Sequence, residues 1–236
     1  MSAHSKNRVK NAGEVLRRLE SATPNEMLEA IGVIDEWRAD HAKPLRRVNA
    51  GLRHYVRKVG VEQPEVTQRL KRFATIADKL RRQPTMALSR MEDIGGARVT
   101  VPTQDQVDAI VRDLRGQPRW NIRRVREYVE GRDPGPKSDG YRAVHVIVVK
   151  DGCFIEVQLR TPRQDAWAQS VEQDTRRLGE GLKFGAGPDD LREYYVLVSE
   201  LLAMRERHEQ PDSVFMEQLA SRFAATRRHF PNEEPR

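Results

Sequence analysis

Residues 142–160 read R-A-V-H-V-I-V-V-K-D-G-C-F-I-E-V-Q-L-R, and this stretch decides the fold. Two runs rich in β-branched residues flank Asp151-Gly152, a dipeptide typical of a two-residue hairpin turn. We therefore predict two antiparallel strands, at 142–150 and 153–160. A one-residue slip in their pairing would exchange the two faces, so every inference about the faces depends on this turn.

The turn also fixes which side chains share a face of the hairpin. If Lys150 pairs with Cys153, counting outward from the turn along the two strands places His145 opposite Gln158. Paired residues share a face of the sheet. One face then carries polar and aromatic groups: Tyr141, His145, Glu156 and Gln158. The other face is apolar and is expected to meet the core: Val144, Val146, Val148, Ile155, Val157 and Leu159. An ordinary half-exposed sheet would give the same pattern, so the hairpin alone leaves the function open.

The regions on both sides of the hairpin have mainly helical patterns. Helices are predicted from the capping box at Thr23, after Pro44, over 63–82, from Thr103 to Gly116, from Thr161, and over 189–208 and 212–229. Strands are predicted at 97–101 and 120–129. Residues 1–22 are expected to form a loose arm or a short helix, and the residues from Pro231 a tail. The sequence thus predicts an α+β fold, with a mixed or antiparallel sheet of about five strands flanked by helices.

Composition narrows the class of protein. The 236 residues carry a formal net charge of +7, which suits a polyanionic partner but also an ordinary arginine-rich surface. The one cysteine, Cys153, excludes an intrachain disulfide. The first residues lack the apolar core of a signal peptide, and no long apolar run follows, so we expect a cytoplasmic protein with no membrane segment.

Three further segments carry candidate site residues. Asp93 precedes a predicted strand in E-D-I-G-G-A-R, where it is either a turn residue or, with Glu156, a ligand for Mg²⁺. The segment 69–79 presents a series of cations that suits phosphate oxygens or a solvated helix face. A Gly- and Pro-rich loop over 128–141 carries Lys137 and leads to Tyr141 and Arg142, which could hold phosphate and stack on a base.

At these residues the sequence resembles the synthetase domain of the RelA/SpoT family, and its small alarmone synthetases in particular. Four motifs occur in the family's order over about residues 45–178. They are R-x-K-x-x-x-[ST]-I-x-x-K at 69–79, D-I-x-G-x-R at 93–98, P-K-x-x-G-Y-R-x-x-H at 136–145, and E-x-Q-[IL]-R-T followed by W-A at 156–168. The resemblance implies a nucleotidyltransferase-like domain at 45–178, with helical extensions at 1–44 and 179–236.

The resemblance also implies roles for individual residues. The ATP side would comprise Arg69 and Arg98 around the adenine, with Lys71, Arg72 and Lys79 at the phosphates. Asp93 and Glu156 would be the catalytic and metal-binding carboxylates for Mg²⁺, with Glu156 also the base for the acceptor hydroxyl. The acceptor side would comprise Tyr141, stacked on guanine, with Lys137, Arg142, His145 and Gln158. The implied reaction moves a diphosphate from ATP to the 3′-hydroxyl of GDP or GTP.

Departures from the family pattern leave the acceptor open. Gln173 stands where many members have histidine, and the loop 131–135 departs from the common pattern, as does Glu127. The alternative is a toxic small alarmone synthetase that modifies the 3′ end of tRNA or makes adenosine alarmones, with an antitoxin partner. A non-catalytic nucleotide- or RNA-binding relic is a third interpretation. No hydrolase motif is expected, and the apolar segments at 191–202 and 214–223 could pack between subunits or on their own domain.

Overall fold

The structure is a computed structural model that describes residues 5–179 and 187–230. The chain divides into two compact units, and each contains segments that are distant in sequence. Unit 1 comprises residues 1–99, 108–125 and 145–159. Unit 2 comprises residues 100–107, 126–144 and 160–236.

The five-stranded mixed sheet confirms the predicted fold class. Its strands, in the order β1-β2-β5-β4-β3, are β1 (Glu65–Leu70), β2 (Gly95–Thr100), β3 (Ile122–Tyr128), β4 (Ala143–Lys150) and β5 (Cys153–Arg160). Asp151 and Gly152 both have positive φ, 52° and 81°. Positive φ at both central residues is the geometry of a type I′ hairpin turn, so the predicted β4–β5 hairpin is confirmed.

The two faces of this hairpin differ as the register predicts. On β5, Ile155 and Val157 are fully buried, whereas Glu156 and Gln158 between them remain partly exposed. On β4, Val144, Val146 and Val148 are also buried. The apolar face therefore meets the core, and the other face carries the polar groups.

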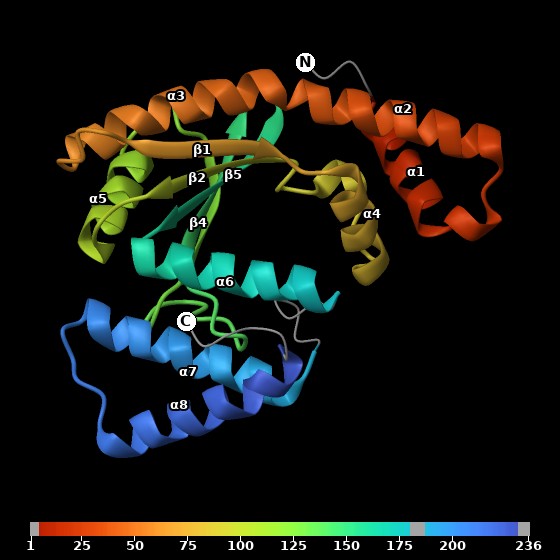
Figure 1. Ribbon diagram of the computed structural model, residues 1–236. Coiled ribbons are helices and arrows are strands. Elements are labelled where there is room, and N and C mark those ends of the chain that lie inside the picture. The colour runs from red at the N-terminus through yellow and green to blue at the C-terminus, as the bar shows by residue number, and fades with distance from the viewer. Residues whose placement is uncertain (1–4, 180–186, 231–236) are drawn as a thin grey trace. The chain divides into compact units, whose positions relative to one another are not determined.

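The helices of unit 1 include α1 (Lys6–Arg17), α2 (Pro24–Asp40), α3 (Ala42–Lys58) and α4 (Phe73–Arg82), with short 3-10 turns η1 (Leu19–Ser21) and η2 (Leu88–Arg90). In Figure 1, α3 runs along β1, and α1 folds back beside α2. The predicted capping box at Thr23 and Glu26 is present at the start of α2. Apolar residues of α1, α2, α4 and η2 share one core: Val9, Leu16, Val33, Ile34, Trp37, Ile76, Leu80, Leu88 and Met91.

Two predictions about this region need correction. The predicted helix over 63–82 is wrong in its first part, because residues Glu65–Leu70 form β1 and the helix begins only at Phe73. A strand at a sheet edge owes its conformation to its neighbour, and local patterns do not show that pairing. Helix α3 begins at Ala42, so Pro44 lies inside its first turn rather than before it.

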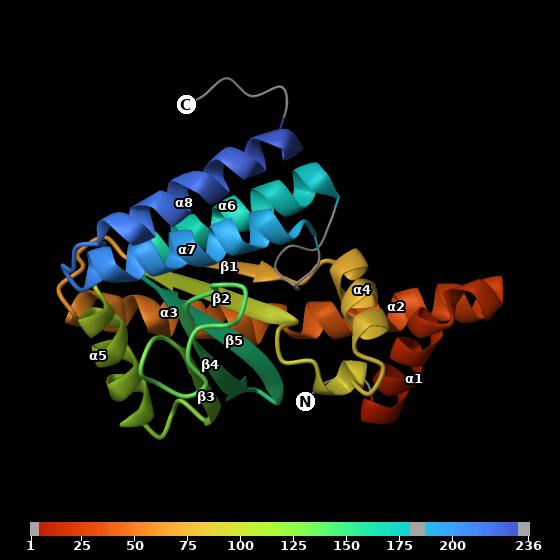
Figure 2. The same cartoon turned by 90° about the horizontal axis from the view of Figure 1, so that it is seen from below.

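Unit 2 holds the helices α6 (Pro162–Leu178), α7 (Asp189–Glu206) and α8 (Ser213–Thr226), followed by η4 (Arg227–His229). Figure 2 shows α7 and α8 side by side, and α6 and α7 also contact each other. Trp167, Val171, Leu191 and Tyr195 form the core between α6 and α7. The predicted capping box of α6 at Thr161 and Gln164 is present, and the predicted tail from Pro231 lies outside the described residues.

Helix α5 (Gln104–Arg115) follows β2 and confirms the predicted capped helix. Thr103 and Gln106 exchange the hydrogen bonds of a capping box at its start. Across residues 5–179 and 187–230, the structure contains no helix whose length and apolar character would let it cross a membrane.

Candidate active site

A carboxylate held by two lysines forms the centre of the candidate site in unit 1. Lys71 Nζ donates to Asp93 Oδ2 at 2.8 Å, and Lys79 Nζ donates to Asp93 Oδ1 at 2.9 Å. Lys71 directly follows β1, Lys79 lies on α4, and Asp93 precedes β2. The backbone N–H of Lys71 donates to the carbonyl of Ile94 at 2.8 Å, which fixes the end of β1 beside Asp93.

Gly95 allows the chain to pass close to the sheet just after Asp93. A Cβ at this position would lie 2.7 Å from Ile155 Cδ1, closer than two carbon atoms can approach. Any larger side chain would therefore require the Ile155 side chain or the start of β2 to shift. The close approach permitted by this glycine is to the Ile155 side chain.

The second carboxylate, Glu156, is held by its neighbours on the hairpin. His145 Nδ1 lies 3.0 Å from Glu156 Oε1, and Gln158 Nε2 donates to Glu156 Oε2 at 2.8 Å. These contacts require the three side chains to share one face, as the predicted register has it. A one-residue slip would have placed His145 on the opposite face of the sheet from Glu156.

The surroundings keep both carboxylates ionised. Burial would raise the pKa of Asp93, but the charges of Lys71 and Lys79 outweigh that effect and the pKa is lowered. Burial would likewise raise the pKa of Glu156, but His145, Gln158 and Lys79 together hold it far below its ordinary value. The charge of Glu156 also acts on Asp93 and raises its pKa, but less than the two lysines lower it.

This donor set suits a hard divalent cation that also binds phosphate. Asp93 and Glu156 offer ionised carboxylate oxygens, which Mg²⁺ prefers. Within the part of the chain that the structure describes, no group of three or more His, Cys, Asp and Glu residues could hold a metal ion by itself. A Mg²⁺ ion here would therefore take further oxygens from water and substrate phosphates, as this ion commonly does.

The predicted ATP-side arginines lie around the same cluster of unit 1. On β2, Ala97 and Val99 are buried in the core, so Arg98 points to the opposite face, the face of Glu156. Arg69 is exposed near the end of β1, on the face opposite to the buried Val66. Arg72 is exposed and immediately precedes α4.

The predicted acceptor residues of unit 2 gather around the ring of Tyr141. Arg160 Nη2 donates to Tyr141 Oη at 2.6 Å, and the Arg160 guanidinium carbon lies 5.1 Å from the ring centroid. Lys137 Nζ lies 4.6 Å from the same centroid and 4.9 Å from that of Tyr128. Trp167 meets Tyr141 edge-on at 6.3 Å between ring centroids. The tyrosine is therefore held in place on several sides.

Arg142 is engaged more fully than its predicted phosphate-binding role requires. Its side chain is 5% exposed, Nε lies 2.9 Å from Glu130, and Nη2 lies 2.5 Å from Glu206 on α7. Thr161 also donates to Glu206. Two carboxylates thus neutralise this guanidinium, so a phosphate would have to displace at least one of them.

Sequence reasoning missed Arg160 and Asp165 as members of the Tyr141 cluster. Arg160 Nη1 donates to Asp165 Oδ1 at 3.0 Å, while its other nitrogen holds Tyr141. Burial would lower the pKa of Arg160, but Tyr141 and Asp165 raise it, so it stays charged. The period of the strand could have revealed it, because Arg160 continues the series of Glu156 and Gln158.

Comparison with known proteins finds a match to one family model and related sequences. Residues 68–176 match the family model described as "Region found in RelA / SpoT proteins". Uncharacterized proteins of Mycobacterium tuberculosis (strain H37Rv) and Mycobacterium bovis are 27% identical over 191 residues, which is 79% of this chain and 64% of theirs. The chain thus spans less than two thirds of the length of these relatives.

Solved structures show the same fold. The small alarmone synthetase 2 from Bacillus subtilis aligns with a TM-score of 0.63 at 20% identity, over 74% of this chain and 94% of that one. The small alarmone synthetase 1 from B. subtilis, bound to its product pppGpp, gives 0.60 at 21%, over 73% and 94%. A GTP pyrophosphokinase family protein from Streptococcus pneumoniae gives 0.60 at 22%, over 79% and 96%.

Proposed function

Because residues 68–176 match the RelA/SpoT family model, we propose that the chain is a pyrophosphokinase that makes the alarmones ppGpp and pppGpp. It would transfer the β,γ-diphosphate of ATP to the 3′-hydroxyl of GDP or GTP and release AMP. One observation carries the proposal: Lys71 and Lys79 both bind Asp93, in the same unit in which His145 contacts Glu156. This cluster combines phosphate-binding cations with two ionised carboxylates, which are the groups that diphosphate transfer requires.

The ATP side of the reaction follows from the cations. Lys71 and Lys79 each donate to Asp93, and triphosphate oxygens would compete for the same ammonium groups. Arg69 and Arg98 would flank the adenine. A Mg²⁺ ion held by Asp93 and Glu156 would neutralise charge on the transferred phosphates. The protein's own part is then to position ATP and to keep its phosphates in one orientation.

The transfer itself needs one proton acceptor. The acceptor's 3′-oxygen forms a bond to the β-phosphorus of ATP, the bond from that phosphorus to the α-phosphate oxygen breaks, and AMP leaves with the electron pair. Glu156 takes the proton of the 3′-hydroxyl. Its lowered pKa keeps it ionised and able to accept that hydrogen bond, although a weak base takes the proton late, after bond formation has begun.

Guanosine as the acceptor base is supported by the ring cluster and by one structural relative. Tyr141 is fixed by Arg160 and flanked by Lys137, an arrangement that suits a purine stacked on the ring and a phosphate beside it. The B. subtilis synthetase of the same fold binds pppGpp. We therefore place GDP and GTP first among the acceptors, with Lys137, Tyr141, Arg142, His145 and Gln158 as the acceptor residues.

Transfer to tRNA is the second candidate, favoured by the net charge of +7. The basic N-terminal segment supports it less than the sequence suggests, because it forms α1 and Arg17 is engaged within the fold. Arg17 donates to the carbonyls of Leu80, Gln83 and Met86, and Arg18 pairs with Glu26. Lys6 and Lys10 are exposed on α1 and are the better positions at which to test RNA binding.

The remaining parts of the proposal concern its biological setting. We propose a cytoplasmic, stringent-response enzyme that synthesises without hydrolysing, built as a 45–178 catalytic domain with helical extensions. Exposed Val214, Met216 and Phe223 on α8 make a homo-oligomer or an antitoxin contact reasonable to test. The chain spans 64% of the length of its mycobacterial relative, so these points and the acceptor are proposals about this chain alone.

The direct test is incubation of the purified protein with γ-labelled ATP and Mg²⁺, with GDP, GTP, ATP or bulk tRNA in separate reactions. Label in guanosine tetra- or pentaphosphate is the expected result. Label on tRNA or on an adenosine nucleotide would replace the guanosine acceptor while leaving the transfer chemistry in place. If no acceptor is labelled while ATP still binds, the chain is a binding protein and the proposal fails.

A further inference from the structure

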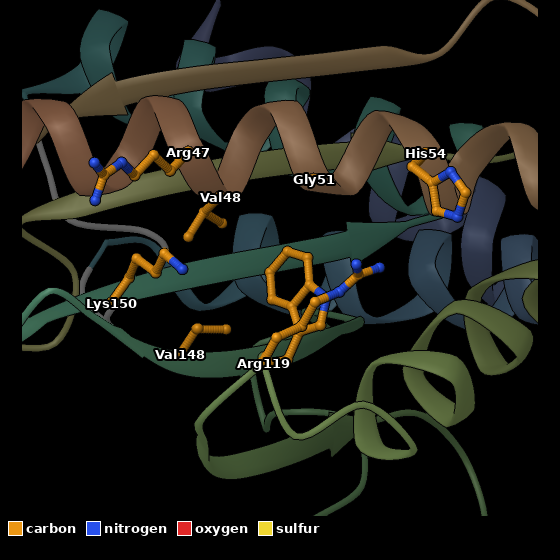
Figure 3. Close-up of a pocket in the computed structure, with 8 residues that line it drawn as sticks. Arg47, Val48, Gly51, His54, Arg119, Val148 and Lys150 are labelled. Carbon is orange, nitrogen blue, oxygen red and sulfur yellow. The ribbon is translucent and has the colours of Figure 1, made fainter.

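A second cavity in unit 1 has the chemistry of a ligand site and plays no part in the chemistry described above. It encloses about 330 Å³, near the lower end of the range for small-molecule pockets. Figure 3 shows it between one side of α3, which carries Arg47, Gly51 and His54, and β4, which carries Val148 and Lys150. The segment before β3 closes it with Arg119 and Trp120.

This cavity lies on the other face of the sheet from Asp93 and Glu156. Val148 belongs to the apolar face of the hairpin, whereas Glu156 belongs to the polar face. A molecule in the cavity would thus be separated from the two carboxylates by the sheet itself. It would not compete with ATP for Lys71 or Lys79.

The electrostatic character of the cavity selects an anion. Eight residues line the cavity, and none of them is acidic. The cationic ones are Arg47, Arg119 and Lys150, and His54 is a further basic residue. Arg47 forms an ion pair with Asp151 at 2.7 Å. Within residues 5–179 and 187–230, no other carboxylate is paired with a cation that lines the cavity. Arg119 donates to the hydroxyl of Tyr55 at 2.7 Å rather than to a carboxylate. Cations at a partly enclosed surface attract phosphate.

The cavity also offers a rigid aromatic and aliphatic wall. The Trp120 indole N–H donates to Tyr55 Oη at 3.1 Å, and the two rings meet edge-on at 5.7 Å. Gly51 permits this packing, because a Cβ there would lie 2.9 Å from Trp120 Cζ2. Val48 and Val148 add apolar surface beside the indole. Fixed aromatic and aliphatic groups beside cations suit a ligand with a planar ring and a phosphate.

We propose that this cavity binds a mononucleotide, with the phosphate at Lys150 and the base against Trp120 and the valines. The volume favours one nucleotide over a longer chain. The site is independent of the proposed transfer reaction, because its residues belong to the opposite face of the sheet.

The three tryptophans of the chain make a direct test available. Trp120 lines the cavity, Trp37 lies in the core of α1 and α2, and Trp167 packs on Tyr141. The protein is labelled with ¹⁵N-tryptophan in a Lys71→Ala/Lys79→Ala background, which weakens the candidate ATP site, and AMP or GMP is titrated. We expect the indole signal that Trp120→Phe removes to shift with saturation, while the Trp37 signal stays in place.

Charge variants locate the phosphate. Lys150→Glu should weaken this binding by about tenfold or more, since a charge-assisted hydrogen bond is replaced by repulsion. Lys10→Glu makes the same charge change on exposed α1 and should leave the affinity within about twofold, as surface charges at a distance are screened. Lys150→Arg should retain most of the affinity.

Several results would overturn the proposal. They are an unmoved Trp120 signal with both nucleotides, equal affinity in Lys150→Glu, equal affinity for adenosine without phosphate, and equal affinity for inorganic phosphate without a base. None of these readouts requires catalysis. Failure here is therefore distinct from failure of the labelled-ATP test.

Discussion

The Asp93–Glu156 cluster of unit 1 and the Tyr141 cluster of unit 2 are built in opposite ways. In the first, two carboxylates are held by the side chains that a substrate would use, since Lys71 and Lys79 bind Asp93. In the second, the recognition ring is held by groups that a substrate need not touch, such as Arg160 and its partner Asp165. The first cluster must rearrange its hydrogen bonds to bind phosphate, whereas the second is already fixed.

If the first cluster carries out the proposed transfer and the second binds the proposed acceptor, variants of the two should have different effects. Damage to the ionic cluster should reduce the rate of transfer. Damage to the ring cluster should change how well the acceptor binds.

Glu156→Gln should lower kcat by roughly 10²–10⁴-fold, because it removes the proton acceptor and one carboxylate of the metal site. Nucleotide binding should remain, since Lys71 and Lys79 are unchanged. The measurement is kcat with labelled ATP together with ATP affinity by titration. Glu62→Gln, at an exposed position, is the control and should behave as the original protein. Retained turnover in Glu156→Gln would remove Glu156 as base and metal ligand.

Tyr141→Ala should weaken use of the acceptor by about 1–3 kcal/mol, the value of one stacked base, mainly as a higher KM. Tyr141→Phe keeps the ring and loses only the hydrogen bond from Arg160, so its effect should be smaller. Steady-state kinetics with varied GDP or GTP distinguish the two. If Phe and Ala behave alike, the hydroxyl rather than the stacking surface is what matters.

Glu206→Ala should destabilise unit 2 by about 1–2 kcal/mol, because it removes a carboxylate hydrogen-bonded to Arg142 and Thr161. Arg142 keeps Glu130 and gains freedom to meet a phosphate. Urea unfolding measures the first effect and acceptor KM the second. Glu200→Ala, exposed on the same helix, is the matched control. Equal stability of the two variants would show that the contact with Glu206 contributes little.

Acid should reduce the stability of the fold through Asp93 and Glu156. The pKa values of Asp93 and Glu156 are lowered in the folded state, so the unfolded chain binds more protons as pH approaches the ordinary values of 3.8 and 4.5. Their contribution is present above that range and is lost as pH falls through and below it. Urea midpoints between pH 6 and 3 should therefore fall less steeply for Asp93→Asn than for the original chain. Parallel curves would contradict the predicted contribution of Asp93.

How much of this could be predicted from sequence depends on the range of the interaction. The Asp151-Gly152 turn fixed the hairpin register, and with it the meeting of His145, Glu156 and Gln158. Local capping boxes at Thr23, Thr103 and Thr161 fixed three helix starts. In each case the signal lies within a few residues of the structure that it determines.

What the sequence did not reveal depends on distant partners. Residues 65–70 form a strand through pairing with β2, which follows about a helix later in the chain. The sequence predicts Arg142 as a phosphate ligand, but in the structure it binds Glu206 of α7, which is 64 residues away in the chain. Leu28 and Ile31 have helical spacing like Ile34 and Trp37, yet are 72% and 39% exposed, because spacing does not say which side of a helix is covered.

The core shared by α1, α2, α4 and η2 has a practical consequence for anyone who shortens this protein. The family match begins at residue 68, which invites removal of everything before it. Such a cut would strip Val9, Leu16 and Ile34 from Ile76 and Leu80, and would expose one side of the helix that carries Lys79. A minimal catalytic fragment should therefore retain the N-terminal helices, and fusion partners are better attached ahead of residue 5 than substituted for α1.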